Sequence, residues 1–388
     1  MDFRFSDDQQ AFRDDVRGFI GDHWDEPPAS LEPEFEDFAQ TKRYEHELAE
    51  RGWLTLAWPE EYGGQAASHL DQTIFREESA YAGAPSGGQG VLMVGPCIMV
   101  HGEPEQRQRF LPPISRGEVT WCQGFSEPGS GSDLASLQTR AVKDGDEYVI
   151  NGQKIWTSGA QNADWIHLLA RTNPDAPKHR GISYFLLDMK TPGIEVRPLI
   201  DLAGGHVVNE TFFTDVRVPA DQMLGEEDRG WYVATTLLDF ERSGIGGAAT
   251  ARRTVDELVN WVRGESQAMT PDVKASARNF LSEAYVETEV ARSLGYRVSW
   301  MQGQGLIPNQ EASMAKMYGS ELGQRTANRG MGLLGLSSQL VDRDDPRAPL
   351  QARLARLHMT LIPTTIAGGS SEIQRNIIAT RGLGLPRE

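Results

Sequence analysis

The order of hydrophobic patterns along the chain is what most constrains its fold. Apolar residues recur at helical spacing up to about residue 117 and again from about residue 229. Between these regions lie short runs that alternate or are rich in β-branched residues, separated by turn signals. The pattern predicts an α+β multidomain protein with an N-terminal α-helical domain (1–117), a middle antiparallel β domain (118–228) and a C-terminal four-helix bundle (229–388).

The first helix is marked at both ends. Ser6, with Gln9 three residues later, forms a capping box in which each side chain bonds the other residue's backbone N–H. Apolar residues then recur at helical spacing as far as Ile20, and the acidic and proline residues at 25–28 stop the helix. A second helix is expected at about 38–51.

The middle region has the composition of an antiparallel sheet. Two segments, Asp144-Gly145-Asp146 and Asn151-Gly152, are typical of the tight turns that join antiparallel strands. The runs with strand-like composition are 147–150, 155–157, 165–170, 182–187 and 211–218.

Composition and charge exclude several classes of protein. The net charge of −17 over 388 residues argues against a nucleic-acid partner, which would require a basic face. The two cysteines, Cys97 and Cys122, form neither a disulfide framework nor a metal site, so we expect a reducing compartment and no metal. No apolar run approaches the roughly 18 residues of a membrane span, and the first residues lack a signal pattern. A cytoplasmic protein without a membrane partner is expected.

Four stretches carry the strongest functional signal. They occur, in chain order, at 125–133, 151–159, 213–225 and 368–375. Each is weak alone, but in this order, on an α–β–α layout, they resemble the signatures of the acyl-CoA dehydrogenase family over nearly the whole chain. The resemblance implies that family's fold, an acyl-CoA substrate and FAD as cofactor.

The first stretch is rich in glycine and small hydroxyl residues, which let backbone N–H groups approach a ligand closely. The resemblance implies that Phe125, Ser126, Gly131 and Ser132 bind FAD. Ser126 is expected at the flavin pyrimidine, and Ser132 near the diphosphate and also at the substrate. The alternative is a plain solvated turn.

The second and fourth stretches complete the implied FAD site. Trp156 and Ser158 are expected on one strand, facing the same way. By resemblance, Trp156 packs on the dimethylbenzene end of the flavin, and the Ser158 hydroxyl replaces a threonine hydroxyl that bonds the flavin N5. Alternatively, Trp156 is a core residue. Gly368, Ser370 and Glu372 are implied FAD contacts at the start of the last helix, where the helix N-terminus favours phosphate.

The fourth stretch lacks the residue that often acts as catalytic base in this family. A glutamate commonly precedes the Gly-Thr pair of that signature, and this chain has Gly368 at that place. Removal of an α-proton requires a carboxylate with a raised pKa, which burial among apolar groups provides. One subset of the family, including isovaleryl-CoA dehydrogenase, carries the base on the first C-terminal helix, at the position that matches Glu241. Glu372, the other candidate, is equally explained as an acid complementing the helix dipole.

The surroundings of Glu241 support its assignment if the helix is continuous. Its neighbours three, four and seven residues away are all apolar or small, with no cation among them. They are Ala234, Leu237, Leu238, Gly244, Ile245 and Ala248. A carboxylate in such a place is functional or is paired with a distant cation.

The substrate contacts are implied by resemblance. Asp239 and Arg242 border the acyl-CoA channel in the family, although a surface ion pair is the alternative. The thioester carbonyl would be polarised by the FAD ribityl hydroxyl and the backbone N–H of Gly368. Gly244, Gly246 and Gly247, expected in one helix, indicate room for a bulky, branched or ring-containing acyl group.

Two departures bear on assembly. The family's aromatic residue that reaches a neighbouring subunit's FAD is absent from 263–267, and 334–337 holds one glycine instead of a pair. The chain is therefore similar to bacterial members that form mixed α2β2 assemblies, with a homotetramer as the alternative. An electron-transfer flavoprotein is the implied electron acceptor. Two other functions stay open: a partner subunit that only completes another chain's site, and a flavin oxidase or monooxygenase of the same fold.

Overall fold

The computed structural model describes residues 4–25, 35–240 and 244–386. The chain divides into two compact units, which are here called the helical unit and the sheet unit. The helical unit draws on 1–31, 67–86 and 242–388, and the sheet unit on 32–66 and 87–241. Parts of the N-terminal region therefore group in space with the C-terminal helices rather than with their neighbours in sequence.

The helical unit begins as the sequence predicts. The Gln9 backbone N–H donates to Ser6 Oγ over 3.2 Å, and the Ser6 N–H donates to Gln9 Oε1 over 3.0 Å, which confirms the capping box. The helices of this unit are α1 (Asp7–His23), α3 (His69–Ala82), α7 (Ile245–Glu265), α8 (Pro271–Gly303), α9 (Asn309–Leu334), α10 (Arg353–Thr360) and α11 (Ser371–Ile377).

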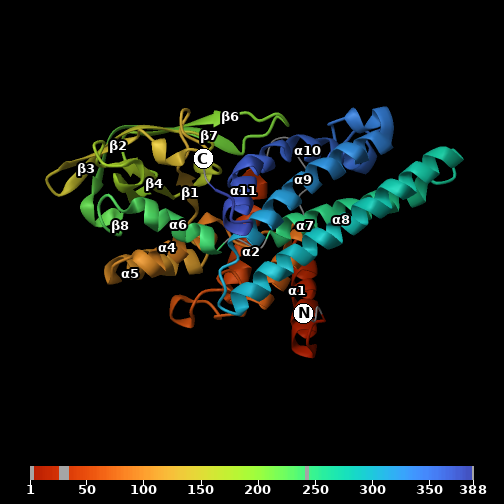
Figure 1. Cartoon of the computed structure of the whole chain (residues 1–388), viewed down its shortest axis with the longest axis horizontal. Coiled ribbons are helices and arrows are strands. Elements are labelled where there is room, and N and C mark those ends of the chain that lie inside the picture. The colour runs from red at the N-terminus through yellow and green to blue at the C-terminus, as the bar shows by residue number, and fades with distance from the viewer. Residues whose placement is uncertain (1–3, 26–34, 241–243, 387–388) are drawn as a thin grey trace. The chain divides into compact units, whose positions relative to one another are not determined.

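The core of the helical unit lies between α7, α8, α9 and α10 (Figure 1). Each of these helices buries a large apolar side chain in one cluster, which matches the predicted C-terminal bundle. Leu258 comes from α7, Phe280 from α8, Leu334 from α9 and Leu354 from α10. Such contacts, rather than helix propensity, stabilise helices in water.

Ion pairs attach α1 and α8 to α3. The Glu78 carboxylate of α3 accepts from Arg13 and Arg17 of α1. Its neighbour Glu77 accepts from the Arg292 guanidinium and the Tyr296 hydroxyl of α8. Both glutamates are buried, and a buried carboxylate is costly unless it is paired, so these contacts offset the cost of removing the two side chains from water.

In its described residues, the sheet unit contains eight strands in the order β6-β7-β3-β2-β4-β5-β8, with β1 paired to β4. Most neighbours are antiparallel, as predicted, but β1 and β2 each pair with β4 in parallel, so the sheet is mixed. The strands are β1 (Trp121–Gly124), β2 (Arg140–Asp144), β3 (Glu147–Lys154), β4 (Trp165–Arg171), β5 (Ile182–Asp188), β6 (Ile194–Leu199), β7 (Val208–Pro219) and β8 (Met223–Leu224).

Among the described residues, four helices complete the sheet unit, together with short 3-10 and π-helical turns. A buried apolar cluster fills one face of the sheet, with Ile150, Leu168 and Phe185 fully covered. The helices are α2 (Phe35–Glu50), α4 (Gly95–His101), α5 (Pro104–Ser115) and α6 (Gly230–Phe240).

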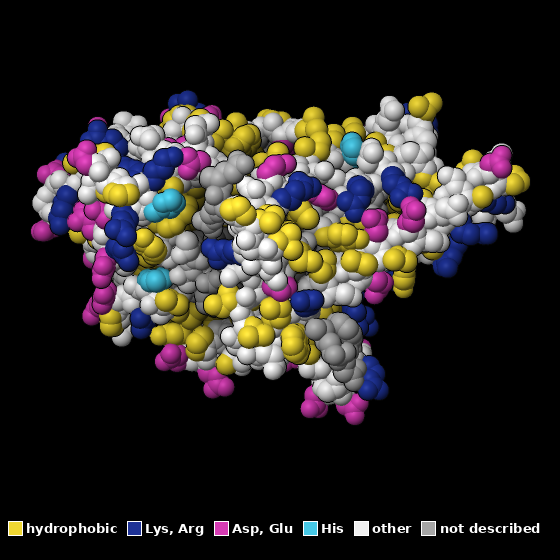
Figure 2. Space-filling model, viewed as in Figure 1, with side chains coloured by type: hydrophobic (Ala, Val, Ile, Leu, Met, Phe, Trp, Pro, Cys, Tyr) yellow, Lys and Arg dark blue, Asp and Glu magenta, His cyan; other side chains and the backbone are white. Residues whose placement is uncertain are grey.

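Charged side chains of both signs are mixed over the surface of the sheet unit, at the left of Figure 2. Ion pairs between strands and within one strand account for part of this mixture. The exposed Arg217 guanidinium of β7 lies 3.1 Å from Asp144 of β2 and 3.0 Å from Glu147 of β3, and Arg197 pairs with Glu195 along β6. Pairs in such exposed places contribute little to stability, because water screens the charges.

Two sequence predictions in this unit were wrong. Asn151-Gly152 is not a turn but part of β3, where a bulge shifts the register against β7. A Cβ on Gly152 would lie 2.7 Å from the Thr139 Cα, so the glycine is required by close backbone approach. The predicted strand 155–157 is a loop after β3 ends at Lys154. The turn at Asp144-Gly145-Asp146 is confirmed between β2 and β3.

Two features are absent from the described ranges. No helix in residues 4–25, 35–240 and 244–386 is long and apolar enough to cross a membrane. No group of three His, Cys, Asp or Glu side chains in the same part of the chain is arranged to hold a metal ion.

Substitution of Glu77 by glutamine is expected to lower the free energy of unfolding by about 1–3 kcal/mol, because Arg292 would lose its charged partner in a half-buried place. Urea denaturation measures this loss. Asp14→Asn is the control, since the Asp14–Arg17 pair is exposed and should contribute about 0–1 kcal/mol. Equal losses in the two variants would contradict the assignment.

Candidate functional site

A buried carboxylate organises the first signature. Glu127 accepts from the backbone N–H groups of Gln138, at 2.6 Å, and Thr139, at 2.8 Å. The Lys154 ammonium donates to Glu127 over 2.8 Å and to the Phe125 carbonyl over 3.0 Å. The loop after β1 is therefore fastened to the last residue of β3.

The Glu127–Lys154 pair stays ionised at neutral pH. Burial lowers the pKa of the Lys154 ammonium to about 8, against the opposing charge of Glu127. Burial alone would raise the pKa of Glu127, but Lys154, Thr139 and Gln138 outweigh it and hold that pKa below its usual value. Each ion thus keeps the other charged in a water-poor place.

The glycines of this loop face outward. Gly129, Gly131 and Ser132 are exposed, and a Cβ on either glycine would meet nothing within 4 Å. An open cavity of about 490 Å³ lies beside the loop, lined by residues that include Pro128, Gly129 and Ser130. Ser126 is half-buried, and its carbonyl accepts from the N–H of Ile155.

The loop after β3 presents an exposed tryptophan. Trp156 is 62% exposed and has a φ of 62°, which is unusual for a residue with a side chain. This exposure rules out the core alternative, and the prediction that Trp156 and Ser158 face the same way along a strand was wrong. Ser158 is half-buried, whereas Thr157 between them is buried with its hydroxyl unpaired among the described residues.

The Phe125 ring packs against a buried histidine, His167. His167 of β4 packs edge-on against the Phe125 ring, with centroids 5.1 Å apart, and its Nδ1 lies 2.7 Å from the Tyr184 hydroxyl. Its Nε2 has no partner among the described residues. Burial lowers the pKa of His167 to about 3, so the ring is neutral at physiological pH.

In the helical unit, the fourth signature forms a tight turn before α11. Gly368 and Gly369 have φ angles of 63° and 87°, which glycine adopts without strain. Ser370 caps α11 by accepting from the Ile373 N–H. The Lys316 ammonium of α9 donates to the Gly369 carbonyl over 2.7 Å and to the Thr364 carbonyl over 3.0 Å.

Glu372 does not have the environment of a catalytic base. Its side chain is 78% exposed and lies 3.8 Å from Arg375. Hydrogen bonds from its own backbone N–H and from Ser370, with the charge of Arg375, hold its pKa below the usual value. A base that removes an α-proton requires the opposite shift.

The other carboxylate candidate falls between α6 and α7. Glu241 and Arg242 lie outside the described residues, and Asp239 is placed by its backbone in α6. α6 ends at Phe240, and Gly244, with a φ of 65°, precedes α7. The expectation of one continuous helix through Gly244, Gly246 and Gly247 was therefore wrong, and helical spacing beyond Glu241 says nothing about its neighbours.

Sequence reasoning missed three residues that organise these loops: Glu127, Lys154 and His167. Glu127 and Lys154 lie inside recognised signatures and carry opposite charges, so an ion pair between them could have been predicted from the sequence. Nothing near His167 in sequence marked it, because its role comes from a ring contact with a residue 42 positions earlier, Phe125.

Comparison with known proteins adds the family. Models of the acyl-CoA dehydrogenase N-terminal, middle and C-terminal domains match residues 6–118, 122–216 and 228–383. The chain belongs to the acyl-CoA dehydrogenase family. It is therefore an oxidoreductase acting on acyl-CoA, a class that typically carries a flavin.

The relatives are similar over nearly their whole length. Acyl-CoA dehydrogenase IpdE1 of Mycobacterium tuberculosis is 37% identical, covering 98% of this chain and 99% of its own. Acyl-CoA dehydrogenase FadE26 of the same organism is 38% identical over 88% of this chain and 87% of its own.

Solved structures give the same fold. The ChsE4-ChsE5 complex from Mycobacterium tuberculosis has a TM-score of 0.89 at 35% identity. The Tcur3481-Tcur3483 steroid ACAD has a TM-score of 0.89 at 34% identity. The matches cover 100% of both chains in each case.

His167→Phe is expected to flatten the loss of stability in acid. The unfolded histidine binds a proton near pH 6.5 and the folded one near its pKa of about 3, so wild type loses stability as pH falls between these values. The slope from this residue approaches about 1.4 kcal/mol per pH unit. Urea denaturation at pH 4.5, 5.5 and 7 tests this; parallel curves for both proteins would contradict it.

Lys316→Met is expected to loosen the turn before α11, because two carbonyls lose their charged donor. Amide hydrogen exchange over 364–370 should quicken about tenfold or more, with smaller changes elsewhere. Lys190→Met, at an exposed lysine, is the control. Unchanged exchange over 364–370 would show that Lys316 does not hold this segment.

Proposed function

We propose that the protein catalyses α,β-dehydrogenation of an acyl-CoA thioester, with FAD as hydride acceptor and Glu241 as the base. The observation that carries the base assignment is the environment of Glu372. That carboxylate is exposed, and its pKa is lowered rather than raised. Since Gly368 has no acidic group, the position that matches the base of isovaleryl-CoA dehydrogenase is the best remaining candidate.

The residues of the sheet unit fit a flavin. Trp156 exposes a large aromatic ring, beside a buried Thr157 hydroxyl that has no partner among the described residues. Both features favour a ligand that covers the ring and offers hydrogen-bond partners. The exposed backbone of Gly131 and Ser132 is open to the diphosphate, and Phe125, Ser126 and Ser158 lie in the same two loops. Gly368, Ser370 and Glu372 are proposed as further FAD contacts.

FAD, when bound, supplies the acceptor for the β-hydrogen. Glu241 then takes the α-proton of the substrate. The Gly368 N–H has no acceptor among the described residues, so it is free to donate to the thioester carbonyl oxygen and stabilise charge that develops there. Asp239, Arg242 and Ser132 are proposed to contact the CoA ester.

The acyl group is proposed to be branched or ring-containing. Room beside Gly247, where a Cβ would meet nothing within 4 Å, supports this choice. A solved relative, the Tcur3481-Tcur3483 protein, is a steroid ACAD, and a steroid is a group of fused rings.

The assembly is proposed to be an α2β2 heterotetramer with a second chain of the same family, and an electron-transfer flavoprotein is the proposed acceptor. Two relatives carry the names of two proteins each, ChsE4-ChsE5 and Tcur3481-Tcur3483. The missing aromatic at 263–267 supports the same conclusion, because a partner can supply a contact that this chain lacks.

Glu241→Gln is expected to abolish flavin bleaching by acyl-CoA esters while leaving bound flavin in place. Anaerobic absorbance at the flavin band, after addition of a panel of esters, measures this. We expect a loss of at least about 10³-fold in the reduction rate, since general-base catalysis alone contributes about 10²–10⁴-fold.

Glu372→Gln tests the other carboxylate and should lose far less of the reduction rate than Glu241→Gln, because Glu372 is proposed to contact FAD rather than to remove the proton. If Glu372→Gln lost flavin reduction while Glu241→Gln kept it, Glu241 would be rejected as the base. Wild-type protein that purifies without flavin, or with flavin that no ester bleaches, would favour the partner-subunit function. Rapid peroxide formation in air would favour an oxidase.

A further inference from the structure

Three buried side chains of the sheet unit carry titratable groups that the proposed reaction does not use. They are the Cys97 thiol of α4, the His167 imidazole of β4 and the Tyr184 phenol of β5, and each residue is 0% exposed. Removing such groups from water is costly unless they find hydrogen-bond partners. Their contacts with one another therefore indicate what they do.

The three groups form a series that starts at helix α6. The Cys97 thiol donates to the Val233 carbonyl of α6, with sulfur and oxygen 3.5 Å apart. The Tyr184 hydroxyl bonds Cys97 and lies 2.7 Å from Nδ1 of His167. His167 in turn packs against the Phe125 ring, at a centroid distance of 5.1 Å. A continuous path of contacts thus connects α6 to the first signature.

Only one direction of donation gives each hydrogen of the series an acceptor of its own. The thiol has one hydrogen, and the Val233 carbonyl can only accept it. The Cys97 sulfur must then accept from the Tyr184 hydroxyl, whose oxygen must accept from an N–H at Nδ1 of His167. Burial, with the Cys97 thiol beside the phenol, raises the pKa of Tyr184 well above its usual value, so the phenol keeps its hydrogen.

The second ring nitrogen of His167 agrees with this direction. Nε2 is buried and has no hydrogen-bond partner among the described residues. In a neutral imidazole whose hydrogen is on Nδ1, Nε2 carries only a lone pair. A buried acceptor without a partner is tolerated more often than a buried N–H without one. His167 is therefore the tautomer with its hydrogen on Nδ1.

A second bond holds α6 against α4 one turn further along both helices. Nε2 of His101, four residues after Cys97, lies 2.8 Å from the hydroxyl of Thr236, three residues after Val233. Residues at these spacings lie on one face of a helix, so the two bonds follow one line of contact. α6 ends at Phe240, so its position sets the point from which the chain continues to the proposed base.

We propose that this series of three side chains positions α6 and Phe125 relative to each other for flavin reduction. Cys97, Tyr184 and His167 are therefore positioning residues, which act through α6 and Phe125 rather than on the substrate. α6 carries Asp239 and leads to the proposed base, and Phe125 is proposed to contact the flavin. A misplacement of about 1 Å can lower a reaction rate about 10²-fold, so a fixed distance between them matters. The inference rests on the proposed function.

The direction of donation is tested by NMR of protein whose histidines carry heavy nitrogen. The imidazole signals that are missing from His167→Phe identify His167. We expect its Nδ1 to carry the hydrogen and its Nε2 to be bare at pH 7, whether or not flavin is bound. A hydrogen on Nε2, or exchange between the two tautomers, would overturn the series.

The positioning role is tested by Tyr184→Phe, which removes the hydroxyl and keeps the ring. Anaerobic flavin reduction by the most reactive ester of the panel, at several concentrations, separates the limiting rate from ester binding. The limiting rate should fall roughly two- to tenfold, the range for one hydrogen bond, while the half-saturating concentration stays within about twofold. Tyr81→Phe is the matched control, because it removes an exposed tyrosine hydroxyl that bonds Asp256.

A double-mutant cycle tests whether the bonds act as one series. Cys97→Ala should slow reduction by a factor similar to that of Tyr184→Phe, and the double variant should be no slower than either, because the series is already broken. Cys97→Ser keeps a donor and an acceptor and should retain more of the rate than Cys97→Ala. Losses that add across the two sites would show that Cys97 and Tyr184 act separately, and would reject the series.

Structural damage and failure of the proposed function are recognised separately. Thermal melting and the flavin spectrum identify a variant that has unfolded or lost flavin, in which case the two Cys97 variants and the His167 tautomer decide the question. Folded Tyr184→Phe protein that reduces flavin at the wild-type rate would overturn the positioning role and leave dehydrogenation intact. Wild-type flavin that no ester of the panel bleaches would instead reject the proposed function.

Discussion

The buried ion pair between Glu127 and Lys154 is the interaction on which the loops proposed to bind the flavin depend. The Glu127 carboxylate accepts hydrogen bonds from two backbone N–H groups of the loop after β1. The Lys154 ammonium donates to the carbonyl of Phe125. Burying two ions is unfavourable unless each is fully bonded. The pair therefore holds the loop before β2 and the end of β3 in one arrangement, from which Gly131 and Trp156 are presented to the outside.

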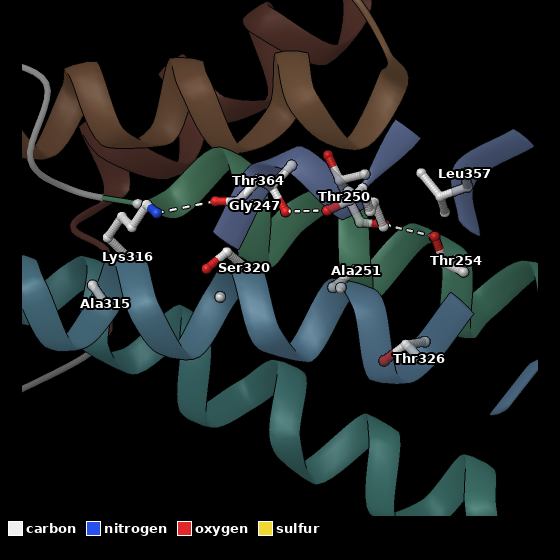
Figure 3. A pocket seen from close by; sticks show the side chains of 14 residues that line it. Gly247, Thr250, Ala251, Thr254, Ala315, Lys316, Ser320, Thr326, Leu357 and Thr364 are labelled. Carbon is white, nitrogen blue, oxygen red and sulfur yellow. Dashed lines mark hydrogen bonds between the residues drawn. The ribbon is translucent and has the colours of Figure 1, made fainter. Parts of the chain in front are cut away.

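In the helical unit, side chains likewise hold a segment without regular structure by bonding its backbone groups. Side chains from α9 hold the irregular segment that leads to α11. Lys316 bonds the carbonyls of Thr364 and Gly369, and Gln324 bonds those of Leu361 and Ile362 at 3.0 Å. The turn at Gly368 can thus adopt left-handed backbone angles without a regular element around it. A cavity of about 280 Å³ between α7 and α9 (Figure 3) is lined by Lys316, Leu361 and Thr364, so it lies beside these hydrogen bonds. The segment proposed to bind the thioester begins next to it.

The differences between expectation and structure share a cause. Trp156 was placed on a strand because its neighbours alternate, yet β3 ends at Lys154, where the side chain turns inward to meet Glu127. Asn151-Gly152 has the composition of a turn, but the close approach of Thr139 makes it a bulge. In each case a contact with a residue distant in sequence overrode a local preference.

The sequence by itself determined the order of helical and strand regions, the capped first helix, and membership of the family, because periodicity and short motifs are local properties. It also excluded a carboxylate at Gly368. Only the tertiary structure decided that Glu372 is exposed, that Trp156 is not core, and that α7 begins after a left-handed Gly244. Burial, ion pairing and open space are set by residues far apart in the chain, and no local pattern of residues encodes them.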